Sequence, residues 1–312
     1  MTNARGFYSK SSNYFIVISI IGLLFISIIF LSAFKSNLIN QEPPGITATS
    51  PFMPEKVEFC GEKVPIEFFD VFEGLERELI VNTYYHSQTI LYIKKANRYF
   101  PVIENILKKN NIPDDFKYLA VAESGLSNVV SPANATGFWQ LLESTAEDYK
   151  LEVNDEVDER YHLEKSTEAA CRFLQESYNK YNNWVLVAAS YNVGRRGVDR
   201  QIDRQGETDY FDLLFNEETA RYVYRIIAIK LIIENPVSYG FHFEKDELYK
   251  PSRYRVVTVS GPVIDWGEFA RENGTNYKLL KLLNPWLRDK TLTNKNHKEY
   301  LIKIPTTRII DK

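Results

Sequence analysis

Apolar side chains recur every three to four residues along most of residues 71–236, which is the spacing of one face of an α-helix. The pattern predicts a long amphipathic stretch over 71–100, broken once, followed by helices near residues 101–110, 115–124, 165–182, 184–193 and 216–235. Residues 131–151 read as a loop that leads into another helix. Pro101 fits the first turn of its helix, and Gly125 and Gly194 fit helix ends. A run of helices on short connections predicts an all-α domain over residues 66–245.

The pattern changes after Pro251. Residues 254–261 alternate apolar and polar positions like a strand, and residues 299–305 do the same at the end of the chain. Two short helical patterns lie between them, over 265–274 and 276–287. We therefore expect a separate β-α-α-β unit over residues 251–307, so that the fold class is mainly α with one small mixed module.

Residues 14–34 contain no charged side chain and are long enough to cross about 30 Å of hydrocarbon as a helix. A cleaved signal peptide is the alternative, but its apolar core is usually about 7–15 residues long. Arg5 and Lys10 favour a cytoplasmic N-terminus over residues 1–13. The sequence predicts an N-terminal transmembrane anchor, a Pro- and Thr-rich tether over 35–65, and a folded part on the periplasmic side of the inner membrane.

Composition narrows the possible partners. The net charge of −3 and the isoelectric point near 5.9 argue against nucleic acid. The four histidines are scattered and form no metal-binding motif, so no metal site is expected. Cys60 and Cys171 would be able to pair outside the cytoplasm, or Cys171 belongs to a helical core.

Glu123 continues an apolar stripe on the predicted helix that precedes Gly125. Phe116, Leu119 and Ala120 lie one or two turns before it on the same side. Burial raises the pKa of a carboxyl group, and a Glu with a pKa near neutrality can donate a proton and then accept one. The alternative is an edge Glu whose carboxylate reaches water.

Three further segments accompany Glu123-Ser124. They are Gly137-Phe138-Trp139-Gln140, then Ala189-Ser190-Tyr191-Asn192-Val193-Gly194, then Tyr222 in the last long helix. In this order and spacing they resemble the motifs of the lysozyme-like lytic transglycosylases of bacteria, especially the membrane-bound murein transglycosylase D group. Phe138, Val193 and Glu143 stand where the family more often has Leu, Ala and Pro, and none of these changes removes a group that the chemistry needs.

The resemblance implies a lysozyme-like catalytic domain that cleaves the β-1,4 bond between N-acetylmuramic acid and N-acetylglucosamine in peptidoglycan and leaves 1,6-anhydro ends. Glu123 would act as acid and then as base, without cofactor or metal. Ser124 would orient Glu123 or the muramyl group, and Tyr191 or Tyr222 would hydrogen-bond Glu123. Gln140 and Asn192 would hold the glycan.

The C-terminal unit resembles a LysM peptidoglycan-binding module through its element order, Leu282-Leu283-Asn284 and the final Ile302-Lys303-Ile304-Pro305. The Gly-Asp-Thr-Leu start usual in that family is absent, so both glycan binding and a structural role of this unit stay open.

Two other functions of the whole chain also stay open. A hydrolytic muramidase would use water and a second carboxylate such as Glu143 or Asp148, and a non-catalytic envelope protein would only bind peptidoglycan.

Overall fold

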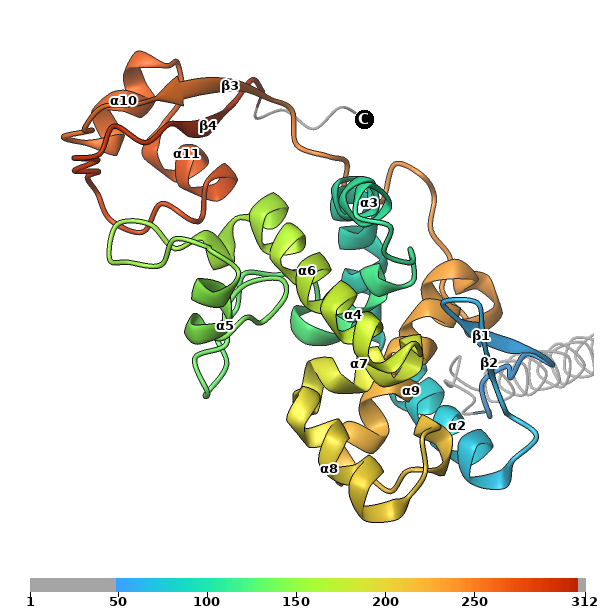
Figure 1. Cartoon of the computed structure of the whole chain (residues 1–312). Helices are drawn as coiled ribbons and strands as arrows, with labels where there is room; N and C mark the ends of the chain where they lie inside the picture. The colour runs from blue at the N-terminus through green and yellow to red at the C-terminus, as the bar shows by residue number, and fades with distance from the viewer. Residues whose placement is uncertain (1–48, 308–312) are drawn as a thin grey trace, which may run out of the picture. The chain divides into compact units, whose positions relative to one another are not determined.

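The computed structural model describes residues 49–307 (Figure 1). The predicted anchor at 14–34, the N-terminal residues 1–13 and the first part of the predicted tether lie outside this range. Between residues 49 and 307, no helix is both long and apolar enough to span a bilayer.

The described chain is mainly helical from residue 69 to residue 239, as the periodicity predicts. The predicted stretch over 71–100 is broken once, at Tyr85, and α4 ends at Gly125 in the left-handed conformation. The α-helices are α2 Phe69–Tyr84, α3 His86–Lys109, α4 Phe116–Ser124, α5 Glu143–Asp148, α6 Leu163–Tyr181, α7 Trp184–Val193, α8 Arg195–Gln205 and α9 Glu217–Glu234. Short 3-10 helices are η1 Glu159–Tyr161, η2 Tyr210–Asp212 and η3 Pro236–Tyr239.

Pro101 does not begin a helix, so this prediction was wrong. It lies inside α3, which continues for two more turns beyond it. Proline has no N–H to donate to the carbonyl of Asn97, four residues earlier, and this costs helix stability. Packing compensates for the loss, because α3 buries one continuous apolar face on both sides of the proline: Ile93, Ala96, Phe100, Ile103 and Leu107.

The assignment of residues 35–65 to a tether was wrong at its C-terminal end. Strands β1 (Val57–Phe59) and β2 (Glu62–Val64) form an antiparallel pair, and Val57, Phe59 and Val64 are buried in the helical core. The turn is tied to α4, because the Cys60 N–H donates to Asp115 Oδ2 at 2.7 Å. The carboxylate of Glu62 accepts two backbone N–H groups at the start of α7, at 2.7 and 3.1 Å. Cys60 and Cys171 are both free thiols.

Helix α4 packs against α3 and α9, while α9 also packs against α2 and α7. Phe116, Tyr118, Leu119, Ala120 and Val121 of α4 are all buried. Figure 1 shows α4 among these longer helices. This packing fixes the short helix on several sides, so the residue in its last turn is held rigidly.

The C-terminal unit has the predicted β-α-α-β order. Strand β3 (Tyr254–Val259) pairs antiparallel with β4 (Tyr300–Pro305), and α10 (Trp266–Glu272) and α11 (Tyr277–Leu283) lie between them in sequence. Its core contains Trp266, Leu280 and Ile302, and also two residues that precede α6, Val157 and Tyr161. Backbone hydrogen bonds join the same regions, from the Asp158 N–H to the Trp286 carbonyl at 2.9 Å and from the Arg288 N–H to the Glu156 carbonyl at 2.8 Å.

Candidate active site

Glu123 lies in the last turn of α4. Phe116, Leu119 and Ala120, the stripe on which the sequence places it, are completely buried. Glu123 itself keeps partial exposure to solvent. The side chain therefore lies at the edge of the core, with part of its surface accessible to solvent.

Tyr222 of α9 donates a hydrogen bond from its hydroxyl to Glu123 Oε1. Its side chain is buried, so the contact is shielded from water. Tyr191 was the other tyrosine considered for this contact. Its hydroxyl instead donates to the Trp139 carbonyl at 2.7 Å, and its ring packs edge-on against Phe173. Of the two tyrosines, Tyr222 is therefore the one that contacts the acid.

Burial raises the pKa of Glu123 from an ordinary value of 4.5 to about 7. The hydrogen bond from Tyr222 and the positive charge of Arg225 act in the opposite direction, because both favour the carboxylate. The negative charge of Glu218 raises the pKa further. Desolvation by the surrounding protein outweighs the stabilising partners, so Glu123 keeps its proton to higher pH than an ordinary Glu.

The segment that carries Gly137 and Gln140 is attached directly to α4. Ser124 Oγ donates to the Phe138 carbonyl at 2.8 Å and to the Ala120 carbonyl at 3.1 Å. Gln140 has a positive φ of 46° and its Nε2 donates to the Gly137 carbonyl at 2.8 Å. Ser124, predicted to orient Glu123 or the muramyl group, and Gln140, predicted to hold the glycan, both hold the segment beside Glu123.

Gly137 has to be glycine. Its φ is +83°, and a Cβ there would lie 2.1 Å from the carbonyl oxygen of Arg160. Two residues on, Trp139 is fully buried and its Nε1 donates to Thr167 Oγ1 at 2.8 Å. The segment is therefore fixed at one end against η1 and at the other against α6.

Asn192 connects the end of α7 to the start of α9. Its Oδ1 accepts a hydrogen bond from Thr219 Oγ1 at 2.8 Å, and its Nδ2 donates to Glu218 Oε1 at 3.3 Å. Thr219 lies three residues before Tyr222 on α9. The four predicted motifs therefore converge, since each contacts either Glu123 or an element that holds Glu123 or Tyr222.

Two family profiles match the chain. The profile of the "Transglycosylase SLT domain" matches residues 100–214, and that of the "Soluble lytic transglycosylase C-terminal LysM-like domain" matches residues 255–308. The chain carries a transglycosylase SLT domain and a LysM-like domain. It is also homologous to the membrane-bound lytic murein transglycosylase D of Escherichia coli, with 30% identity over 227 residues, 70% of this chain and 48% of that protein. The chain spans about half the length of the curated relatives it matches.

Two solved structures were also compared with this chain. The 70 kDa soluble lytic transglycosylase of Escherichia coli aligns over 45% of this chain and 24% of its own, with 19% identity and a TM-score of 0.39. An inactive variant of the lytic transglycosylase Slt of Pseudomonas aeruginosa aligns over 48% of this chain and 26% of its own, with 17% identity and a TM-score of 0.37.

Three charged residues beside the site were missed by the sequence analysis and lie outside the part that matches the SLT profile. Glu78 of α2 is fully buried and faces Arg221 and Arg225 of α9. The sequence did contain a signal for Glu78. It follows Val71 and Leu75 at helical spacing, which places it on the buried face of α2. The same argument had identified Glu123.

Glu143 and Asp148, the candidates for a second carboxylate, are exposed at the two ends of α5. The charged side chains that act on Glu123 are Arg225 and Glu218. Neither α5 carboxylate is among them.

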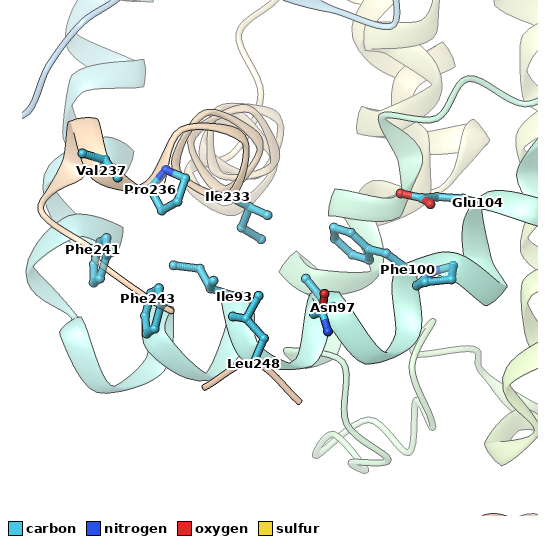
Figure 2. A pocket seen from close by; sticks show the side chains of 12 residues that line it. Ile93, Asn97, Phe100, Glu104, Ile233, Pro236, Val237, Phe241, Phe243 and Leu248 are labelled. Atoms are coloured by element: carbon cyan, nitrogen blue, oxygen red, sulfur yellow. The ribbon is translucent and has the colours of Figure 1, made fainter. Parts of the chain in front are cut away.

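A cavity of about 410 Å³ lies away from Glu123, and Figure 2 shows the side chains that line it. It lies between α3, the end of α9 and residues 236–248, and apolar side chains such as Ile93, Phe100, Ile233, Phe241 and Phe243 line most of it. Glu123 is not part of its lining. The candidate active site is therefore located by Glu123 and its partners.

Proposed function

We propose that this chain is a peptidoglycan lytic transglycosylase in which Glu123 acts first as acid and then as base. The observation that carries the proposal is a desolvated Glu123 with a pKa of about 7 that accepts a hydrogen bond from the buried Tyr222. The ideal pKa for a group that must give and take a proton lies near the working pH. The SLT domain and the homology to an enzyme named as a lytic murein transglycosylase support this choice of reaction.

The proposed reaction cleaves the bond between N-acetylmuramic acid and N-acetylglucosamine. Protonated Glu123 gives its proton to the glycosidic oxygen as the bond from that oxygen to the muramyl C1 breaks. The muramyl N-acetyl group stabilises the positive charge at C1. The Glu123 carboxylate then takes the proton of the C6 hydroxyl, whose oxygen bonds to C1 and closes the 1,6-anhydro ring. Glu123 ends the cycle protonated, and no water is consumed.

The residues around Glu123 have distinct roles in this proposal. Tyr222 orients the carboxyl group and stabilises its ionised form between the two proton transfers. Ser124 and Gln140 fix the segment that forms one side of the site, and the Gln140 amide oxygen contributes to holding the glycan. Asn192 keeps the start of α9, and with it Tyr222, in position. Tyr191 supports the Trp139 backbone.

The closing experiment is mass spectrometry of purified murein digested by the chain. We expect muropeptides with 1,6-anhydro ends, each one water lighter than the product of hydrolysis. Glu123→Gln should abolish cleavage while circular dichroism stays unchanged. Hydrated products would indicate the hydrolytic alternative, and residual activity within about tenfold of wild type in the variant would exclude Glu123 as the acid, since loss of a general acid typically costs about 10²–10⁴-fold.

We further propose that residues 14–34 anchor the chain in the inner membrane, with the SLT and LysM-like domains in the periplasm. The length of the apolar run and the flanking Arg5 and Lys10 support this topology. Protease added to spheroplasts should digest the large domain. Full protection would refute the orientation, and a mature form that starts near Lys35 would refute the anchor.

A further inference from the structure

Arg225 faces the carboxylate of Glu78, and its positive charge also acts on that of Glu123. It follows Tyr222 by three positions and Arg221 by four, so on α9 it neighbours both the residue that contacts Glu123 and the residue that contacts Glu78. Arg225 Nε lies 3.6 Å from Glu78 Oε2. Its charge also acts on Glu123, where it lowers the pKa. The single guanidinium is therefore shared by a buried structural carboxylate and the candidate acid.

Glu78 is unusual for a charged residue in a core. Its side chain is fully buried where α2 packs on α9. Oε1 accepts a hydrogen bond from Arg221 Nε at 2.7 Å, whereas Oε2 has no hydrogen-bond partner and faces only the more distant Arg225. Desolvating a carboxylate is expensive unless positive charge compensates it. Glu78 therefore draws Arg225 towards α2.

Few other charges compete for Glu123. From α9, Glu218 and Tyr222 act on it together with Arg225, whereas burial and the nearby Glu123 raise the pKa of Tyr191 on α7, so its hydroxyl stays neutral. From α3, Lys95 donates to the Gly125 carbonyl at 3.0 Å, and the Tyr92 ring lies against Gly125. Among the described residues, Arg225 is thus the cation whose charge lowers the pKa of Glu123. How far it lowers that pKa depends on whether the guanidinium also pairs with another carboxylate.

We propose that Glu78 is a positioning residue for the acid, because it anchors Arg225 on the α2 side of α9 and prevents the guanidinium from pairing with Glu123. This inference rests on the proposed function of Glu123. Without Glu78, Arg225 turns to the remaining carboxylate and holds Glu123 in its ionised form. The enzyme would then lack the proton that the first step needs.

The test is the pH profile of kcat/KM for the full chain and its Glu78→Gln variant. Gln keeps the size of the side chain and removes its charge. We expect the alkaline limb to move to lower pH by about one unit, the smaller end of the effect of a close opposite charge on a carboxyl pKa. The plateau at low pH should change much less. A structural defect alone would lower the plateau and leave the limb in place.

Three further variants sharpen the test. Glu217→Gln removes an exposed carboxylate that pairs with the same Arg221 and should leave the limb where it is. Arg225→Gln should move the limb to higher pH, because the charge that favours the Glu123 carboxylate is gone. Glu78→Gln combined with Arg225→Gln should match Arg225→Gln alone, since Glu78 acts through Arg225. A Glu78→Gln effect that persists unchanged without Arg225 would overturn the proposal.

A measurement that needs no activity separates this inference from the proposed function. The pKa of Glu123 can be followed by the ¹³C shift of its carboxyl carbon in the full chain and in Glu78→Gln. A lower Glu123 pKa in the variant supports the positioning role even if wild-type digests contain no anhydro product, which would refute only the proposed function. Equal Glu123 pKa values in the two proteins refute the positioning role, whatever the products are.

Discussion

Replacing Glu123 by Gln should change the pH dependence of folding stability as well as activity. Burial holds the pKa of the folded carboxyl at about 7, against 4.5 for an ordinary Glu. Below pH 4.5 the group is protonated in both the folded and the unfolded chain and stability is unaffected. Between 4.5 and 7 the unfolded chain ionises first, so the free energy of unfolding falls as pH rises. Above pH 7 the loss is complete.

The size of this loss follows from the two pKa values. The difference between about 7 and 4.5, at about 1.4 kcal/mol per pKa unit, is about 3 kcal/mol. Gln does not titrate, and its carbonyl oxygen still accepts the hydrogen bond from Tyr222. Between pH 4 and pH 8, the free energy of unfolding of the variant should therefore rise by about 3 kcal/mol relative to that of wild type. The other titrating groups are the same in both proteins, so their contributions drop out of the difference.

Urea denaturation of both proteins at several pH values between 4 and 8 measures this difference directly. A constant difference across the range would refute the burial argument, because it would mean that the folded and unfolded pKa values of Glu123 are equal. If the variant became clearly less stable as pH rises, Glu123 would instead be held as a favourable ion, and the sign of the reasoning would be wrong.

Other predictions follow from single contacts. Tyr222→Phe removes a hydrogen bond that favours the ionised form of Glu123, so the alkaline limb of the pH–activity profile should move to higher pH. A limb at lower pH would contradict this. Gly137→Ala should lower the unfolding free energy by about 2 kcal/mol or more, because φ is positive at this position and the added Cβ would lie 2.1 Å from the Arg160 carbonyl oxygen. Gly261→Ala is the control: its added Cβ meets nothing within 4 Å, and urea denaturation should find little change.

Sequence periodicity could predict the elements that bury a wide apolar face. Helices α4, α6 and α9 and the C-terminal β-α-α-β order belong to this class, and the existence of each was predicted. The hairpin at 57–64 could not be found in this way, since each strand has three residues and shows too little alternation. Helix α8 was missed for a related reason, because only Gly197 and Val198 are buried and most other positions are charged or polar.

At the candidate site, sequence could identify the residues but not assign their contacts. Tyr191 and Tyr222 are equally plausible partners of Glu123 in the sequence, and only the packing of α7 and α9 gives the contact to Tyr222. The roles of Ser124 and Gln140 in fixing a segment depend on loop backbone geometry, which leaves no periodic signal. Glu78 could have been found, because its position on the buried face of α2 follows from spacing alone.

The residues shared between η1 and the C-terminal unit affect how this architecture can be recombined. Small modules are often exchanged between proteins by joining at the linker that precedes them. Here a cut near residue 250 would uncover Val157 and Tyr161, which complete the core of the C-terminal unit, and would remove Trp286 as the partner of the Asp158 backbone. The neighbouring Arg160 carbonyl is the group that Gly137 packs against. An intact transfer of the C-terminal unit would therefore have to include residues 156–161 together with 251–307.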